Sequence, residues 1–266
     1  MTQAISPATA SDTLRQIVNL IGAPMIWLSS SLGIFLPNVR SPQDFSDLSE
    51  NLLVPFGAAF SIWFPIFIGI TIYGIVQMLP RNKTRTIFRA TGWWIAAGFW
   101  LCTAWGLITA YAPDGVVELT ATLVFIPAML SLVVAMVKLS RGRAQLSGAE
   151  IWTVLVPISL IAGWCSIAVF VGANGLIFSY VQNLGWSAVG TALSVLSLAL
   201  GWAIVVLRRG ATNRAYAFPI IWGLAFLALR HLGQAGGTTI IGGAAILGIF
   251  IVIATAVYRP RDFRAP

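Results

Sequence analysis

Few side chains in this sequence could carry out acid–base, nucleophilic or metal chemistry, and they are scattered. The chain has one histidine, His231, and two cysteines, Cys102 and Cys165, and all three lie in or beside apolar segments. Two thiols without a neighbouring histidine do not form a zinc site, and a lone histidine is more often a surface residue than a haem or chlorophyll ligand. No nucleophile has a base beside it. The sequence therefore predicts a protein that is not an enzyme, with no metal site and no cofactor that these residues would hold.

Aromatic side chains are the remaining candidates for a functional site, because the chain holds 11 Trp, 15 Phe and 5 Tyr. Trp93, Trp94 and Trp152 lie near the expected cytoplasmic ends of apolar segments, where indole rings prefer the headgroup region. Trp63 and Trp105 lie deeper, in the outer half of their segments. Large rings inside a helical bundle either fill the core or line a cavity for a flat apolar molecule. The composition leaves both alternatives open.

The elements that position these rings are membrane-spanning helices. The 266 residues are 58% hydrophobic and 9% charged, with a mean hydropathy of +0.87, whereas a soluble domain has about 45–50% apolar and about 25% charged residues. A spanning helix needs about 20 largely apolar residues. The sequence predicts an all-α polytopic membrane helix bundle of about eight transmembrane helices, at roughly 17–37, 56–80, 88–111, 117–138, 151–174, 185–207, 215–233 and 237–258.

Positive charge alternates with these predicted spans. The formal net charge is +8, and with the N-terminus inside, 14 of the 16 Lys and Arg residues fall on the inner side, which leaves Arg40 and Arg230 outside. Cationic loops are retained in the cytoplasm, so we expect a cytoplasmic (inner) membrane protein with both termini cytoplasmic. The expected cytoplasmic ends are an N-terminal segment, 1–16, and a basic tail, 259–266. A nucleic-acid binder would gather its cations on one surface, so nucleic acid is not an expected partner.

The longest outer connection, roughly 38–55, is acidic and contains Pro42 and Pro55. Long ordered loops in compact proteins are often lids or binding loops, and a solvated connector is the alternative. In the sixth predicted span, four small residues recur on one helical face, where another helix can approach closely. They are Gly190, Ser194, Ser197 and Gly201.

Three motifs resemble those of the TspO/MBR family, the translocator or tryptophan-rich sensory proteins. Residues 55–77, with Ala-Phe-Ser-Ile-Trp at 59–63, resemble the second helix of the longer bacterial branch of that family, which has extra C-terminal helices. Leu-Cys-Thr-Ala-Trp at 101–105 is similar to the family's third-helix Leu-Asn-x-x-Trp. Residues 157–168 are similar to its fifth-helix Pro…Gly-Trp…Ala pattern.

The resemblance implies a TspO-like five-helix core over 17–174, followed by additional transmembrane helices over 175–258. It also implies a pocket under the first outer loop that binds porphyrins, sterols and similar flat lipophiles. By position, the pocket would be lined by Pro55, Phe60, Trp63, Phe67, Cys102, Trp105, Trp164 and Ala168. Relatives usually carry Trp, Tyr and Asn where Gly57, Phe67 and Cys102 stand. These changes remove hydrogen-bonding groups, so we expect a ligand to be held by shape and apolar contact.

Three functions remain in competition. The first is a non-catalytic membrane protein that binds a flat lipophilic ligand, either porphyrin-like (tetrapyrrole) or sterol-like, in an aromatic pocket in the outer half of the bundle, as a sensor or carrier. The second is a structural or assembly subunit of a larger pigment-protein or respiratory membrane complex. The third is a transporter. The expected partners are membrane lipids, a flat lipophilic small molecule that is a tetrapyrrole or a lipid, and either a second copy of the chain or a larger membrane complex.

Overall fold

A computed structural model describes residues 7–46 and 51–258, and the described residues are helical or irregular, with no strand among them. The predicted basic tail, 259–266, lies outside the described residues, as do residues 1–6 of the predicted N-terminal segment. The helices are α1 (Ala10–Ser30), α2 (Leu32–Phe35), α3 (Pro42–Ser46), α4 (Trp63–Met78), α5 (Thr86–Tyr111), α6 (Asp114–Arg141), α7 (Gly148–Glu150), α8 (Val156–Val181), α9 (Ala188–Arg209), α10 (Arg214–Gly233) and α11 (Thr239–Val257).

Shorter helical turns join or extend these elements. They are the 3-10 helices η1 (Gly57–Ile62), η2 (Pro80–Asn82), η3 (Arg143–Gln145) and η5 (Gln182–Leu184), and the π-helical turn η4 (Ile151–Leu155). Two boundaries beyond the first span differ clearly from the predicted spans. Residues 57–62, expected as the start of the second span, form η1 in front of α4, and α8 continues to Val181, beyond the expected end at 174. The expected boundary between the five-helix core and the added helices therefore falls within α8.

The described helices confirm a polytopic helical membrane bundle, and seven of them are long and apolar enough to cross a membrane. The prediction of a first span at 17–37 is wrong in its bounds. Helix α1 begins at Ala10, where Thr9 and Asp12 form a capping box, and it ends at Ser30. It is not among the seven, because its first half carries the polar residues Asp12, Arg15 and others.

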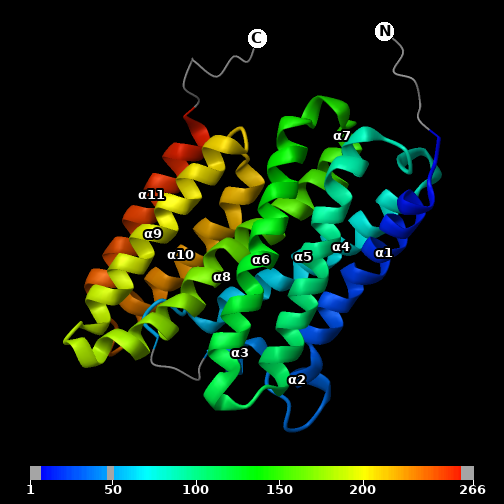
Figure 1. The fold of residues 1–266 in the computed structure, drawn as a ribbon. Coiled ribbons are helices and arrows are strands. Elements are labelled where there is room, and N and C mark those ends of the chain that lie inside the picture. The colour runs from blue at the N-terminus through cyan, green and yellow to red at the C-terminus, as the bar shows by residue number, and fades with distance from the viewer. Residues whose placement is uncertain (1–6, 47–50, 259–266) are drawn as a thin grey trace.

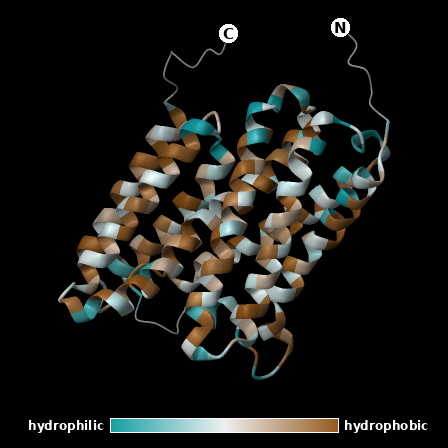
Figure 2. Ribbon diagram, viewed as in Figure 1, coloured by the Kyte–Doolittle hydropathy of each residue, from teal (hydrophilic) through white to brown (hydrophobic). Residues whose placement is uncertain are grey.

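The helices form one continuous bundle (Figure 1). Helix α5 packs on α1 and α6, α6 on α8, α8 on α9 and α10, and α10 on α11. Helix α1 starts and α11 finishes at the same end of the bundle, here named the terminal end, and α2 and α3 lie at the opposite, loop end. Hydrophobic residues cover most of the helix length (Figure 2). Which side of the membrane holds the terminal end stays a prediction.

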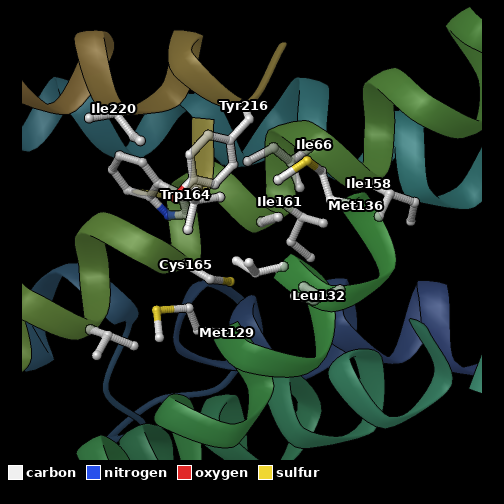
Figure 3. Close-up of a cluster of buried hydrophobic side chains, with 14 of the residues drawn as sticks. Ile66, Met129, Leu132, Met136, Ile158, Ile161, Trp164, Cys165, Tyr216 and Ile220 are labelled. Carbon is white, nitrogen blue, oxygen red and sulfur yellow. The ribbon is translucent and has the colours of Figure 1, made fainter. Parts of the chain in front are cut away.

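The core centres on α8, which contacts α4, α6, α9 and α10. Figure 3 shows Trp164 of α8 lying toward Tyr216 and Ile220 of α10, with Cys165 on the neighbouring face of α8. Gly163 allows α8 and α10 to pack closely, because a Cβ at this position would overlap the Tyr216 carbonyl oxygen. The last three helices are thus packed into the same core as the first five.

Candidate ligand-binding site

A cavity lies at the loop end, beneath the connection between α3 and η1. Its volume is about 90 Å³, measured as the space open to the centre of a water-sized sphere. A single water needs about 10–15 Å³ on this measure, so the cavity has room for several waters or for part of a small ligand. Six of the eight expected site residues line it: Pro55, Phe60, Trp63, Trp105, Trp164 and Ala168. The structure therefore brings most of the expected set around one space, while ligand binding there stays a prediction.

The other two expected residues, Phe67 and Cys102, do not line this cavity. The Phe67 ring stacks on Trp63, with ring centroids 5.2 Å apart and planes 18° from parallel. The Cys102 thiol is buried, and its Sγ lies 3.9 Å from Sγ of Cys165. Phe67 can act on the cavity only through Trp63, and Cys102 belongs to the core contact between α5 and α8.

Ring-to-ring contacts hold the cavity walls. The Trp164 ring meets Trp63 and Phe60 edge to face, at centroid distances of 6.2 and 6.1 Å and interplanar angles of 83°. Elsewhere in the lining, Trp105 of α5 stacks on Phe125 of α6 at 4.6 Å. Edge-to-face and stacked contacts are favourable for aromatic pairs, so they hold the lining rings in one orientation.

One hydrogen-bond donor in this wall has no partner. The Nε1 atom of Trp63 is buried and has no acceptor among the described residues. An indole N–H can only donate, and a buried donor without an acceptor costs about 1–3 kcal/mol.

Helices α9 and α10 close the cavity. Leu196 and Ala199 of α9 and Gly223, Leu224 and Leu227 of α10 line it. Helix α10 also fixes η1, because Trp222 Nε1 donates to the Ala59 carbonyl at 2.9 Å and the Phe226 carbonyl accepts from Phe56 N at 3.2 Å. The sequence motifs did not predict that these residues of α9 and α10 line the cavity. Their position there depends on the packing of α10 against η1.

Helix α6 contributes four further lining residues that the sequence analysis missed: Glu118, Ala121, Thr122 and Phe125. Their spacing of three or four residues puts them on one helical face. That spacing was present in the sequence, but it does not show which helix the face meets. Among the residues that the structure describes, Glu118 is the only charged side chain that lines the cavity.

The loop over the cavity is tied down by Asn51. Its Nδ2 donates to the Val171 carbonyl of α8 at 2.7 Å, and its Oδ1 accepts from Leu53 N at 2.9 Å and from Asn174 Nδ2 at 2.7 Å. Asn51 is 5% exposed. These bonds fix Asn51 and Leu53 against α8 at the end of this connection, which is here named the lid, while residues 47–50 lie outside the described part.

Helix α10 holds the same loop from another direction. Arg230 Nη1 donates to the Val54 carbonyl at 2.7 Å, and His231 Nε2 lies 2.8 Å from the Leu52 carbonyl. His231 Nδ1 accepts from Thr238 N at 3.0 Å. Because Nδ1 is the acceptor, Nε2 carries the proton and donates to the loop. His231 is therefore a structural residue of the lid and not a surface residue.

The start of the loop is held by an ion pair between Arg40 and Asp114, with Nη1 and Oδ1 2.6 Å apart. Inside α3, the Asp44 carboxylate accepts from Ser41 N at 2.8 Å, and hydrogen bonding from Ser41 lowers the pKa of Asp44 below its usual value. At Gly57, a Cβ would lie 2.8 Å from Gln43 Nε2. The side chain of Gln43 thus occupies the position where the family resemblance implies a tryptophan.

The geometry agrees with the comparison to known families. A model of the family described as TSPO-like protein matches residues 16–258, which includes every helix that lines the cavity. No curated protein and no solved structure gives a significant match. Because the family model spans nearly the whole chain, including α9 to α11, this protein belongs to the TSPO-like protein family.

Proposed function

We propose that this multi-pass membrane protein binds a lipophilic small molecule in the cavity at the loop end, without catalysis, as a sensor or carrier. The observation that carries the proposal is the cavity itself, which has aromatic walls and a lid held by Asn51, Arg230 and His231. The buried Trp63 N–H without an acceptor supports a ligand that offers one. The TSPO-like family is generally non-enzymatic, which supports binding as the activity.

The cavity volume favours a narrow ligand over a broad one. Pockets for small molecules usually measure about 300–1,000 Å³, and the aromatic cavity alone measures about 90 Å³. A porphyrin macrocycle would require the lid to move away from α8 and α10. A slender sterol-like or chain-like molecule requires a smaller change, so we rank it above a tetrapyrrole.

The test is a titration of purified protein with protoporphyrin and, separately, with cholesterol, followed by tryptophan fluorescence. We expect saturable quenching. The variant Ala168→Phe fills the cavity and should abolish saturation, while the matched variant Ala97→Phe, on an exposed face of α5, should bind normally. Linear titrations, or equal behaviour of the two variants, would remove the proposal.

A role in assembly is the second candidate, because α9 exposes a stripe of small residues. Ser194, Ser197 and Gly201 are exposed on α9, and a Cβ at Gly201 meets no atom within 4 Å. Such a face can accept another helix. Extraction from native membranes in a mild detergent decides this alternative: a larger complex supports it, and a monomer contradicts it.

A further inference from the structure

We propose that the ligand is an amphiphile with a narrow apolar body and a protonated amine, whose amine lies in a polar chamber beside the aromatic cavity, against Glu118 and Asn174. This inference rests on the proposed function and deepens it. It names the chemical class of the ligand and the residues that select it.

The polar chamber is a second cavity, with a volume of about 230 Å³ on the same measure, between α6 and the far part of α8. It is lined by Asn51, Leu52, Glu118, Asn174, Gly175, Phe178, Ser179, Gln182 and Ala188. Asn51 and Glu118 line both cavities, so the two spaces meet at these side chains.

The volumes favour a ligand that occupies both spaces. Together they reach about 320 Å³, which is at the lower end of the range for ligand pockets, about 300–1,000 Å³. The aromatic cavity alone is well below that range. A molecule that fills the pair has an apolar part between the tryptophans and a polar part in the chamber.

The chamber offers a buried hydrogen-bond acceptor, Oδ1 of Asn174, and each of its amide nitrogens already donates one hydrogen bond. Asn51 Nδ2 donates to Val171 O, Asn174 Nδ2 donates to Asn51 Oδ1, and Gln182 Nε2 donates to Ser179 O. The Oδ1 atom of Asn174 is buried, with the residue only 3% exposed, and it has no partner among the described residues. The orientation of the Asn174 amide follows from Asn51: because Asn51 Oδ1 can only accept, the atom of Asn174 that faces it is Nδ2.

The charge of the chamber selects among donors. Glu118 is half-buried and makes no ion pair with any residue that the structure describes, and it is the only charged side chain among the described residues that line either space. The nearby cation Arg230 does not line them, and it donates to the loop carbonyls of Asn51 and Val54. A carboxylate and an unpaired amide oxygen attract an ammonium group and repel an anion such as a propionate or a fatty-acid headgroup.

Three probes with the same C18 chain test the inference: oleylamine, oleyl alcohol and oleate. Each is titrated into the purified full-length protein and followed by tryptophan fluorescence. We expect oleylamine to bind about 10-fold more tightly than oleyl alcohol, because a hydrogen bond between charged groups is stronger than one to a neutral hydroxyl. Oleate should bind most weakly of the three.

Variants of the carboxylate then assign the preference. Glu118→Gln should bring oleylamine to the affinity of oleyl alcohol and leave the alcohol unchanged, and Glu118→Lys should make oleate the preferred probe. The double variant Glu118→Gln with Gly115→Glu is the matched control, because it restores the net charge one turn away on α6, at an exposed position that lines neither space and where a Cβ meets no atom within 4 Å. It should lack the preference for the amine.

The outcomes separate this inference from the proposed function. If Ala168→Phe leaves the binding of all three probes unchanged, both the proposed function and this inference fail. If Ala168→Phe abolishes binding but the wild type shows no preference for the amine, or Glu118→Gln keeps that preference, only this inference fails. If the double variant Glu118→Gln with Gly115→Glu regains the preference, the selection comes from the general field of the loop end and the chamber is not its source.

Discussion

The helices are packed by different kinds of contact at the two ends of the bundle. At the terminal end, polar side chains cross from helix to helix: Gln16 Nε2 donates to Gln77 O at 2.6 Å, Gln77 Nε2 donates to Gln16 O at 2.7 Å, and Asn19 Nδ2 donates to Gly92 O at 2.9 Å. A Cβ at Gly92 would lie 2.5 Å from Arg15 Cδ. Helices α1, α4 and α5 therefore meet closely there.

At the loop end, aromatic rings meet edge to face, and a cavity lies between them. Buried polar atoms without a partner occur at both ends, including Asn19 Oδ1 at the terminal end and Trp63 Nε1 at the loop end. An unpaired atom alone therefore does not mark a site. Trp63 lines a cavity and Asn174 lines the adjoining chamber, and this added space is what makes the loop end a candidate for binding.

Substituting Gly92→Leu should produce the largest difference between the ends. The side chain would overlap Arg15, and overpacking costs about 1–3 kcal/mol or more. We expect a clear fall in the thermal unfolding midpoint of the detergent-solubilised protein. Gly115→Leu on α6 is the control, since no atom lies within 4 Å of a Cβ at that position. Equal midpoints for the two variants would contradict close packing at the terminal end.

Removing the reciprocal amide pair should have an intermediate effect. Gln77→Ala removes the two hydrogen bonds that Gln77 Nε2 donates to the Gln16 and Gly74 carbonyls, while Gln16 Nε2 keeps its acceptor, the main-chain carbonyl of residue 77. Each lost bond costs about 0.5–1.5 kcal/mol. Gln182→Ala, at an exposed position, should change the unfolding free energy by less than about 0.5 kcal/mol. Urea or thermal unfolding measures both. A cost for Gln77→Ala no larger than that of Gln182→Ala would show that the pair does not hold α1 to α4.

The smallest effect on stability is expected at the loop end, for Trp63→Phe. This change removes the unpaired N–H and keeps most of the ring contact with Phe67 and Trp164, so stability should change by less than about 1 kcal/mol. Binding of a probe with a carbonyl group, such as progesterone, should weaken several-fold relative to the same steroid without a carbonyl. If both steroids lose affinity equally, the N–H does not contact the ligand.

Much of the fold was predictable because the membrane imposes it. Predicted spans such as 88–111 and 215–233 agree with α5 and α10 to within a few residues, since each apolar run must match the hydrocarbon thickness. The first span was misplaced because its helix begins in polar sequence. Asp12 and Arg15 lower its hydropathy, yet they are buried by contacts with distant residues such as Arg89 and Lys83.

The candidate site was predictable only in part. Trp63 and Trp105 line the cavity as expected from the motifs, but Phe67, one turn from Trp63 on the same helix, does not. Glu118 and Asn174 were missed because neither belongs to a motif. They lie 56 residues apart in the chain and line one chamber only because α6 packs against α8.

The sequence by itself determined that this is a helical multi-pass membrane protein of the TSPO-like kind, because the length of an apolar run and a few ordered motifs are local properties of the chain. Only the tertiary structure decided which rings enclose a space and which acceptors are left without donors. Those properties depend on how each helix is rotated against its neighbours, and that rotation is set by contacts between residues far apart in the chain.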